Sequence, residues 1–121
     1  MTKILVIDDS SFQRGRIREI LKKIGEYEIQ EAADGRQGLE MITTFAPDCI
    51  LLDLLMPGMD GLSFLRTLQK QEQHTPVIVL TADIQETTRQ ECLTLGAKEV
   101  FHKPLSPSET DTLRTIINNV L

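Results

Sequence analysis

Short runs of hydrophobic residues alternate along the chain with longer segments in which hydrophobic residues recur every three or four positions. Three runs, Lys3–Asp8, Asp48–Asp53 and Pro76–Thr81, are hydrophobic at every inner position, which is typical of strands buried on both faces. Glu28–Ala32 alternates between polar and hydrophobic residues and indicates a more exposed strand. A fifth run, Glu99–Lys103, is followed directly by a proline, which is typical of a strand end or a sheet edge.

The segments between these runs have the spacing of amphipathic helices. Ile17, Ile20, Leu21 and Ile24 recur at helical intervals, and this first helix should end at Gly25. The same spacing predicts four more helices at Gly35–Thr44, Gly61–Lys70, Ile84–Leu95 and from Ser106 to the C-terminus.

The alternation of strand and helix predicts the fold class. An α/β chain with short links forms a parallel sheet with helices on both faces, because right-handed crossovers place them there. We therefore expect a doubly wound (βα)5 domain that spans residues 1–121. In such folds ligands bind beyond the carboxyl ends of the strands, where the strand order reverses.

Composition excludes several classes of protein. Asp and Glu number 18 against 13 Lys and Arg, and the net charge of −5 disfavours direct binding to nucleic acid. No hydrophobic run approaches the roughly twenty residues of a membrane span, and no signal peptide is visible. Cys49 and Cys92 match no metal-binding or disulfide-rich spacing, so we expect a cytoplasmic protein.

Polar residues stand at the carboxyl ends of four predicted strands. Asp8 and Asp9 end the first strand, Asp53 the third, Thr81 the fourth and Lys103 the fifth. Three carboxylates brought to one edge would repel one another unless they held a divalent cation. Oxygen ligands without nearby His or Cys favour Mg²⁺. The lysine ammonium and the threonine hydroxyl are the donors that a phosphoryl group requires.

Each of these residues also has a purely structural interpretation. Asp8 or Asp9 could cap the following helix, and Asp53 could belong to a turn that ends a strand. Thr81 suits strands and helix caps, and Lys103 would ordinarily be a solvated loop residue. Their joint occurrence at the same ends of the strands favours the functional interpretation.

Several short motifs extend this set. They are Ile7-Asp8-Asp9-Ser10, Ala33-Asp34-Gly35, the segment LDLLMPGMDG at 52–61, Leu80-Thr81-Ala82, Gly96-Ala97 and Lys103-Pro104. In this order and spacing the chain resembles, from end to end, the receiver domains of response regulators in two-component signalling. The resemblance implies a flavodoxin-like (CheY-like) sheet with strand order 2-1-3-4-5.

The resemblance also implies a function. Asp53 would accept a phosphoryl group from the phosphohistidine of a sensor histidine kinase or a phosphotransfer protein. The altered conformation would then change binding to a downstream effector protein, or to a second copy of the chain. The protein would catalyse only its own phosphorylation and dephosphorylation and would not act as an enzyme on other substrates.

The resemblance further assigns the ligands of the site. Mg²⁺ would be held by Asp9, Asp53 and the backbone carbonyl of Leu55, with Asp8 acting through a bound water. Lys103 and Thr81 would bind the oxygens of the transferred phosphoryl group. The peptide bond between Lys103 and the following proline would be cis.

The chain departs from the family at two positions. Val100 stands where receivers commonly carry a Tyr or Phe, and Phe101, next along, should face the opposite side of the sheet. Leu55, two residues after Asp53, is apolar where some relatives carry a side chain that can orient water. We therefore hypothesise a comparatively long-lived phosphoryl group.

Other classes of protein remain as alternatives. A Mg²⁺-dependent phosphatase with an aspartyl-phosphate intermediate would need a second acid two residues after its nucleophile, where this chain has Leu55. A pseudo-receiver that only binds protein would not require the complete set of site residues. The sequence leaves open whether the chain is a stand-alone regulator or a receiver from a longer protein.

Overall fold

A sheet of five parallel strands forms the centre of the computed structural model, which describes residues 1–83 and 85–120. The strands lie in the order β2-β1-β3-β4-β5, so the predicted fold class and strand order are confirmed. The strands are β1 (Thr2–Ile7), β2 (Tyr27–Ala32), β3 (Cys49–Leu52), β4 (Val77–Thr81) and β5 (Glu99–His102).

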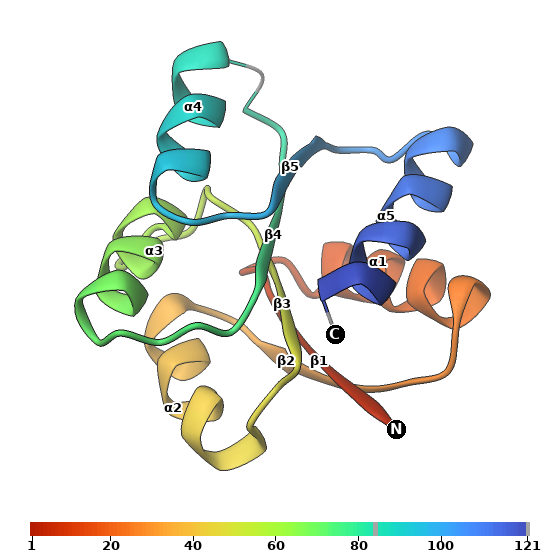
Figure 1. Cartoon of the computed structure of the whole chain (residues 1–121), viewed down its shortest axis with the longest axis horizontal. Coiled ribbons are helices and arrows are strands. Elements are labelled where there is room, and N and C mark those ends of the chain that lie inside the picture. The colour runs from red at the N-terminus through yellow and green to blue at the C-terminus, as the bar shows by residue number, and fades with distance from the viewer. Residues whose placement is uncertain (84, 121) are drawn as a thin grey trace.

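The helices cover both faces of the sheet (Figure 1). Successive side chains along each strand point alternately into two hydrophobic cores, one on each face of the sheet, as the pleat of a β-sheet requires. The helices α2, α3 and α4 pack on one core, and α1 and α5 pack on the other. Their bounds are α1 (Ser11–Ile24), α2 (Gly35–Phe45), α3 (Gly61–Lys70), α4 (Glu86–Thr94) and α5 (Pro107–Val120).

The observed bounds differ from the predicted ones by a few residues, for local reasons. The last helix begins one residue later than predicted because Ser106 caps it. The Ser106 hydroxyl accepts a bond from the Glu109 amide at 3.2 Å, and the Glu109 carboxylate accepts one from the Ser106 amide at 3.0 Å. The fourth helix begins at Glu86, and the predicted start at Ile84 lies outside the described residues.

The cap of α1 decides between two interpretations of the first acidic pair. Ser10 is the N-cap residue, and its hydroxyl accepts a hydrogen bond from the Gln13 amide at 3.2 Å. Neither Asp8 nor Asp9 therefore caps the helix. Both carboxylates lie at the end of β1, where Asp8 Oδ1 accepts a hydrogen bond from the Ser10 amide at 2.9 Å.

Strand register brings distant residues to one edge of the sheet. Ile7 of β1 pairs with Leu52 of β3, so the following residues, Asp8 and Asp53, leave neighbouring strands at the same level. The Asp53 amide donates to the Ile7 carbonyl at 2.9 Å, which continues the pairing one residue past the strand end. The central strands of the sheet thus place both carboxylates.

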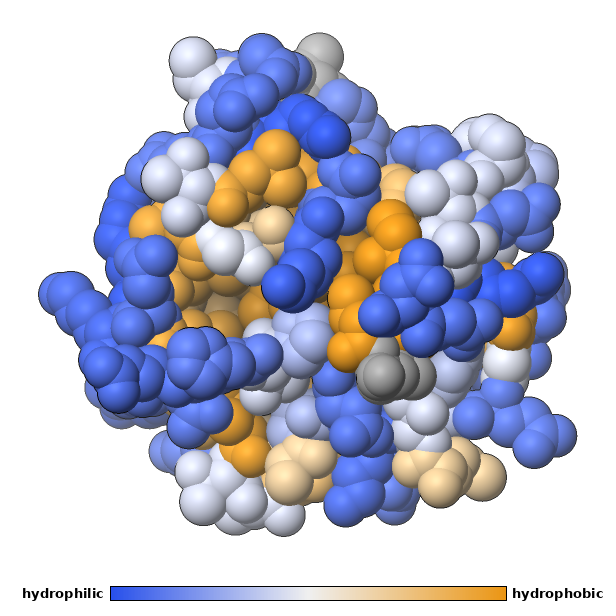
Figure 2. Space-filling model, in the orientation of Figure 1, coloured by the Kyte–Doolittle hydropathy of each residue, from blue (hydrophilic) through white to orange (hydrophobic). Residues whose placement is uncertain are grey.

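Hydrophilic residues cover much of the face shown in Figure 2, and hydrophobic residues are visible mainly towards its middle. In residues 1–83 and 85–120, no helix combines the length and hydrophobicity that crossing a membrane requires.

Gly61→Ala tests the close packing beneath the site. A Cβ at Gly61 would lie 2.7 Å from the Asp53 carbonyl oxygen and 2.7 Å from the Leu54 Cα, and backbone atoms cannot move aside as a side chain can. We expect a loss of about 1–3 kcal/mol in the free energy of unfolding, measured by urea denaturation. Gly15→Ala is the control because nothing lies within 4 Å of its Cβ position. This helical exchange should stabilise the protein by about 0.5–1 kcal/mol, and equal effects of the two substitutions would contradict the packing argument.

Candidate functional site

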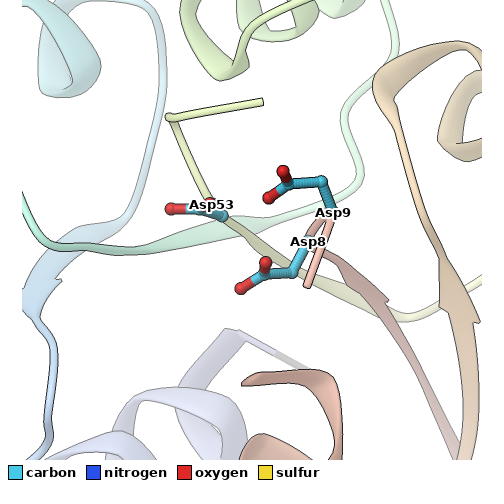
Figure 3. A group of neighbouring side chains, drawn as sticks. All are labelled: Asp8, Asp9 and Asp53. Carbon is cyan, nitrogen blue, oxygen red and sulfur yellow. The ribbon is translucent and has the colours of Figure 1, made fainter. Parts of the chain in front are cut away.

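Three carboxylates meet at the carboxyl ends of the central strands. Asp8 and Asp9 follow β1, Asp53 follows β3, and their carboxyl groups point to the same side of the strand ends (Figure 3). One oxygen from each lies within 4.8 Å of the other two. Asp8 is 1% exposed and Asp53 8%, whereas Asp9 is exposed to solvent. The structure therefore brings the predicted acidic cluster together.

Lys103 provides the positive charge nearest to this cluster. Its ammonium lies 2.5 Å from Asp8 Oδ2 and 3.7 Å from Asp53 Oδ1. The Lys103 amide donates to the Thr81 carbonyl at 2.9 Å, which ties the residue to the end of β4. The peptide bond from Lys103 to Pro104 is cis, as the resemblance implied. A lysine 95 positions away from Asp8 thus reaches the same site.

Burial and charge act in opposite directions on Asp53. Desolvation raises the pKa of this carboxyl above its ordinary value, the positive charge of Lys103 lowers it in part, and the nearby Asp8 raises it again. Hydrogen bonds to the backbone of Leu55 and Leu54 also favour the ionised form. The net effect is a raised pKa, so a cation or a proton is favoured beside Asp53.

These groups line one open cavity of about 470 Å³. The side chain of Leu55 is 58% exposed at its edge. The cavity can hold more than a single phosphoryl group. Its lining residues are Asp8, Asp9, Ser10, Gln13, Arg16, Asp53, Leu55, Ala82, Lys103 and Pro104.

Thr81 is next in the sequence to a residue that lines this cavity, but Thr81 itself does not line it. It is fully buried at the end of β4, and its hydroxyl accepts a hydrogen bond from the Asp83 amide at 3.1 Å. Ala82, the next residue, reaches the cavity instead. The threonine can still donate its own hydroxyl proton to another acceptor.

Val100, which stands where receivers commonly carry an aromatic residue, and its neighbour Phe101 lie on opposite faces of β5, as the alternation of the strand predicted. Val100 is 7% exposed in the core beneath α2, α3 and α4, and Phe101 is 5% exposed in the core beneath α1 and α5. The Val100 carbonyl accepts a hydrogen bond from Arg89 of α4 at 2.9 Å. An arginine therefore links α4 to this strand beside the position of the missing aromatic ring.

Sequence reasoning assigned no role to several residues at the site. Gln13 and Arg16 line the cavity, and Arg14 donates a hydrogen bond to the Asp8 carbonyl at 2.6 Å. All three lie in the first two turns of α1, and their closeness in the sequence to the end of β1 was the available signal.

The site residues fit a hard divalent cation. The donors are carboxylate oxygens from Asp8, Asp9 and Asp53, and no His or Cys belongs to the group of described residues that meets there. Mg²⁺ prefers oxygen ligands and keeps several waters, which suits an open cavity with one exposed carboxylate. Three carboxylates outnumber the two cationic side chains that line the cavity, Lys103 and Arg16, and this excess negative charge favours a cation.

Comparison with known proteins agrees with the fold. The model of the response regulator receiver domain matches residues 4–117. The chain is similar to the protein CcdB of Bacillus subtilis, with 36% identity over 96% of this chain and 95% of that protein. It is also similar to the transcriptional regulatory protein SrrA of Staphylococcus aureus, with 41% identity over 88% of this chain. The match covers 44% of SrrA and 31% of a protein-glutamate methylesterase/protein-glutamine glutaminase of Treponema denticola, so the chain spans less than half the length of these two relatives.

Solved structures share the whole fold. The chemotaxis protein CheY4 of Vibrio cholerae is 33% identical with a TM-score of 0.84, and the match covers 100% of this chain and 99% of that one. The receiver domain of the Francisella response regulator 1452 is 32% identical with a TM-score of 0.87, over 99% and 96% of the two chains.

An acidic cluster and a lysine at the carboxyl ends of a 2-1-3-4-5 sheet define a phosphoacceptor domain of the flavodoxin-like class. The chain belongs to the family of response regulator receiver domains, the phosphoacceptor modules of two-component signalling.

The raised pKa of Asp53 gives a prediction about stability and pH. A carboxyl whose pKa is higher in the folded than in the unfolded protein stabilises the fold only at low pH, and loses that contribution as the pH rises through the folded value. Asp53→Asn should therefore raise the free energy of unfolding at neutral pH, by an amount that shrinks as the pH falls into the range where carboxyls protonate. Urea denaturation across this range measures the difference. Asp111→Asn, at an exposed position of α5, should show no comparable gain. A gain for Asp53→Asn that is independent of pH would contradict the assignment to burial of charge.

Proposed function

We propose that this protein is a signalling switch in which Asp53 accepts a phosphoryl group from the phosphohistidine of a sensor histidine kinase or a phosphotransfer protein. The observation that supports it most directly is the position of Asp53. Its carboxylate is nearly buried, lies 3.7 Å from the Lys103 ammonium, and faces an open cavity that it shares with Asp8 and Asp9.

The transfer itself requires little from the protein beyond position and charge. A carboxylate oxygen of Asp53 would form a bond to phosphorus while the bond from phosphorus to the histidine nitrogen breaks, and the imidazole leaves with that electron pair. Lys103 would hold an oxygen of the phosphoryl group, because an ammonium is the point charge that suits it. Thr81, which does not line the cavity, would move after transfer to bind a second oxygen through its hydroxyl proton.

Asp9, Asp53 and the backbone carbonyl of Leu55 would hold Mg²⁺, with Asp8 acting through a bound water. The ion, when bound, would offset the charge of the phosphoryl oxygens and of the acidic cluster. The fit of three carboxylates within 4.8 Å of one another supports this assignment. Lys103 keeps Asp8 oriented at the same time, since it contacts Asp8 at 2.5 Å.

Phosphorylation would act by shifting a conformational equilibrium. A shift from 1:99 to 99:1 requires about 5.5 kcal/mol of differential binding, and hydrogen bonds to charged groups contribute about 1.5–3 kcal/mol each. Two new bonds at the upper end of this range, or three near its middle, would suffice, and Thr81, Lys103 and the Ala82 amide could form them. The output would be altered binding to an effector protein or to a second copy of the chain.

The chain would act as a switch and not as an enzyme on other substrates. Leu55 cannot serve as the general acid or base that an aspartyl-phosphate phosphatase requires two residues after its nucleophile. The buried free thiols of Cys49 and Cys92 agree with a reducing, cytoplasmic environment. The net charge of −5 agrees with protein partners and with no direct contact to nucleic acid.

Phosphorylation by a small phosphodonor tests the proposal. Incubation with phosphoramidate and Mg²⁺ should add the mass of one phosphoryl group to the wild type, and chelation of Mg²⁺ should reduce the rate strongly. Asp53→Ala should gain no mass, whereas Asp111→Asn should behave as the wild type. Modification of Asp53→Ala at an undiminished rate would show that another residue is the acceptor.

The apolar side chain of Leu55 gives a second test, of the lifetime of the phosphoryl group. Leu55 is 58% exposed at the edge of the cavity and cannot orient a water molecule. Leu55→Asn places an amide there, and we expect hydrolysis of the phosphorylated protein to become at least severalfold faster, followed by loss of mass after the donor is removed. Leu55→Met is the control with similar size and no polar group, and it should keep the slow rate. An unchanged rate in Leu55→Asn would remove Leu55 as the cause of a long lifetime.

A further inference from the structure

A cluster of charged side chains lies behind the acidic site, between α1 and the edge strand β2. Arg14 of α1 donates to the Glu31 carboxylate of β2 at 2.8 Å, and its Nη1 donates to the Asp8 carbonyl at 2.6 Å. Arg18, one helical turn later, binds the same Glu31 carboxylate at 2.9 Å. Arg14 is thus the side chain that connects this cluster to the metal-binding end of β1.

The carbonyl that Arg14 contacts belongs to the peptide unit between Asp8 and Asp9. Because a peptide unit is planar, a bond to its oxygen also fixes the amide nitrogen of Asp9 and the direction in which the Asp9 backbone continues. The Asp8 side chain has its own partners, the Ser10 amide at 2.9 Å and Lys103 at 2.5 Å. In residues 1–83 and 85–120, by contrast, the Asp9 carboxylate has no hydrogen-bond donor. The placement of Asp9 therefore depends on its backbone.

The arginine is itself firmly held. Its side chain is 16% exposed, and its planar guanidinium serves the carboxylate and the carbonyl at the same time. Partial burial alone would raise the pKa of Glu31, but the hydrogen bonds from Arg14 and Arg18 outweigh it and keep that pKa below its usual value. Glu31 thus remains a charged anchor at the pH of the cell.

We infer that Arg14, anchored by Glu31, is a positioning residue for the magnesium site, which orients the peptide unit between Asp8 and Asp9 and so sets the affinity for Mg²⁺. The inference rests on the proposed function in one respect, namely that the three carboxylates hold this ion. Arg14 does not touch the ion or the phosphoryl group. Partners of this kind, behind the first layer of ligands, commonly change metal affinity by about 10–100-fold.

Arg18 provides a matched control. It shares Glu31 with Arg14 and also ties α1 to β2, through the Ile29 carbonyl at 3.3 Å, but no contact links it to Asp8. Arg14→Ala and Arg18→Ala therefore each remove one ion pair between the same two elements. Only Arg14→Ala removes the bond to the peptide unit that precedes Asp9.

Titration of the full chain with Mg²⁺, by calorimetry well below the unfolding temperature of each variant, tests the inference. We expect Arg14→Ala to weaken Mg²⁺ binding about tenfold and Arg18→Ala to stay within about twofold of the wild type, although both lower the unfolding temperature. The ¹⁵N shift of the Asp9 amide should move in Arg14→Ala and not in Arg18→Ala. Equal weakening of Mg²⁺ binding in the two variants would show that Arg14 has only a structural role and would contradict the inference. Wild-type affinity for Mg²⁺ in Arg14→Ala would also overturn it.

Arg14→Lys keeps the test informative if the alanine variant does not fold. A lysine retains the charge but has one donor nitrogen, which cannot serve both Glu31 and the Asp8 carbonyl in the geometry of the guanidinium. We expect a smaller weakening of Mg²⁺ binding than in Arg14→Ala, and an unchanged affinity would contradict the inference. A wild type that binds no Mg²⁺ would instead overturn the proposed metal site, and the positioning role with it, whereas the mass assay on Asp53 reports on the phosphoacceptor separately.

Discussion

The pairing of β1 with β3 is the constraint on which the site depends. Ile7 and Leu52 face each other in the two central strands, and Asp8 and Asp53 follow them at the edge where both strands end. A slip of one residue in this register would send the Asp53 side chain to the other face of the sheet. The register is held by strands that are buried on both sides, so the same hydrophobic packing that stabilises the fold also assembles the acidic cluster.

The acidic cluster costs stability in the absence of a ligand, and in the proposed switch this cost would favour binding of a cation. Burial raises the pKa of Asp53, and Lys103 compensates only in part, because it lies closer to Asp8 than to Asp53. Excess negative charge in a partly buried cavity favours a divalent cation and then a phosphoryl group that can share its charge with the lysine. The electrostatic imbalance therefore links the energetics of the fold to the chemistry of the proposed switch.

The basic residues of α1 divide into groups with different surroundings. Arg14 and Arg18 turn inward to Glu31 of the neighbouring strand, and Arg16 points to the cavity and lies over the Phe12 ring at 5.6 Å. The basic residues of α1 thus include Arg14, the proposed positioning residue for Mg²⁺, and an exposed cation, Arg16, that lines the cavity. The spacing of residues around the helix and the position of β2 beside it decide which arginines contact Glu31 and which one lines the cavity.

The sequence by itself determined the order and type of the elements, because hydrophobic periodicity indicates which faces are buried. It also identified Asp8, Asp9, Asp53 and Lys103, because the carboxyl ends of parallel strands share one edge of the sheet. Only the tertiary structure decided how these side chains are held. The hydroxyl of Thr81 is bound to the Asp83 amide, and Arg14 reaches the Asp8 carbonyl from another element. The hydrophobic periodicity of the sequence indicates neither contact. The physical reason is that burial follows local spacing along the chain, whereas hydrogen bonds between elements depend on rotamers and distances that exist only once those elements have packed.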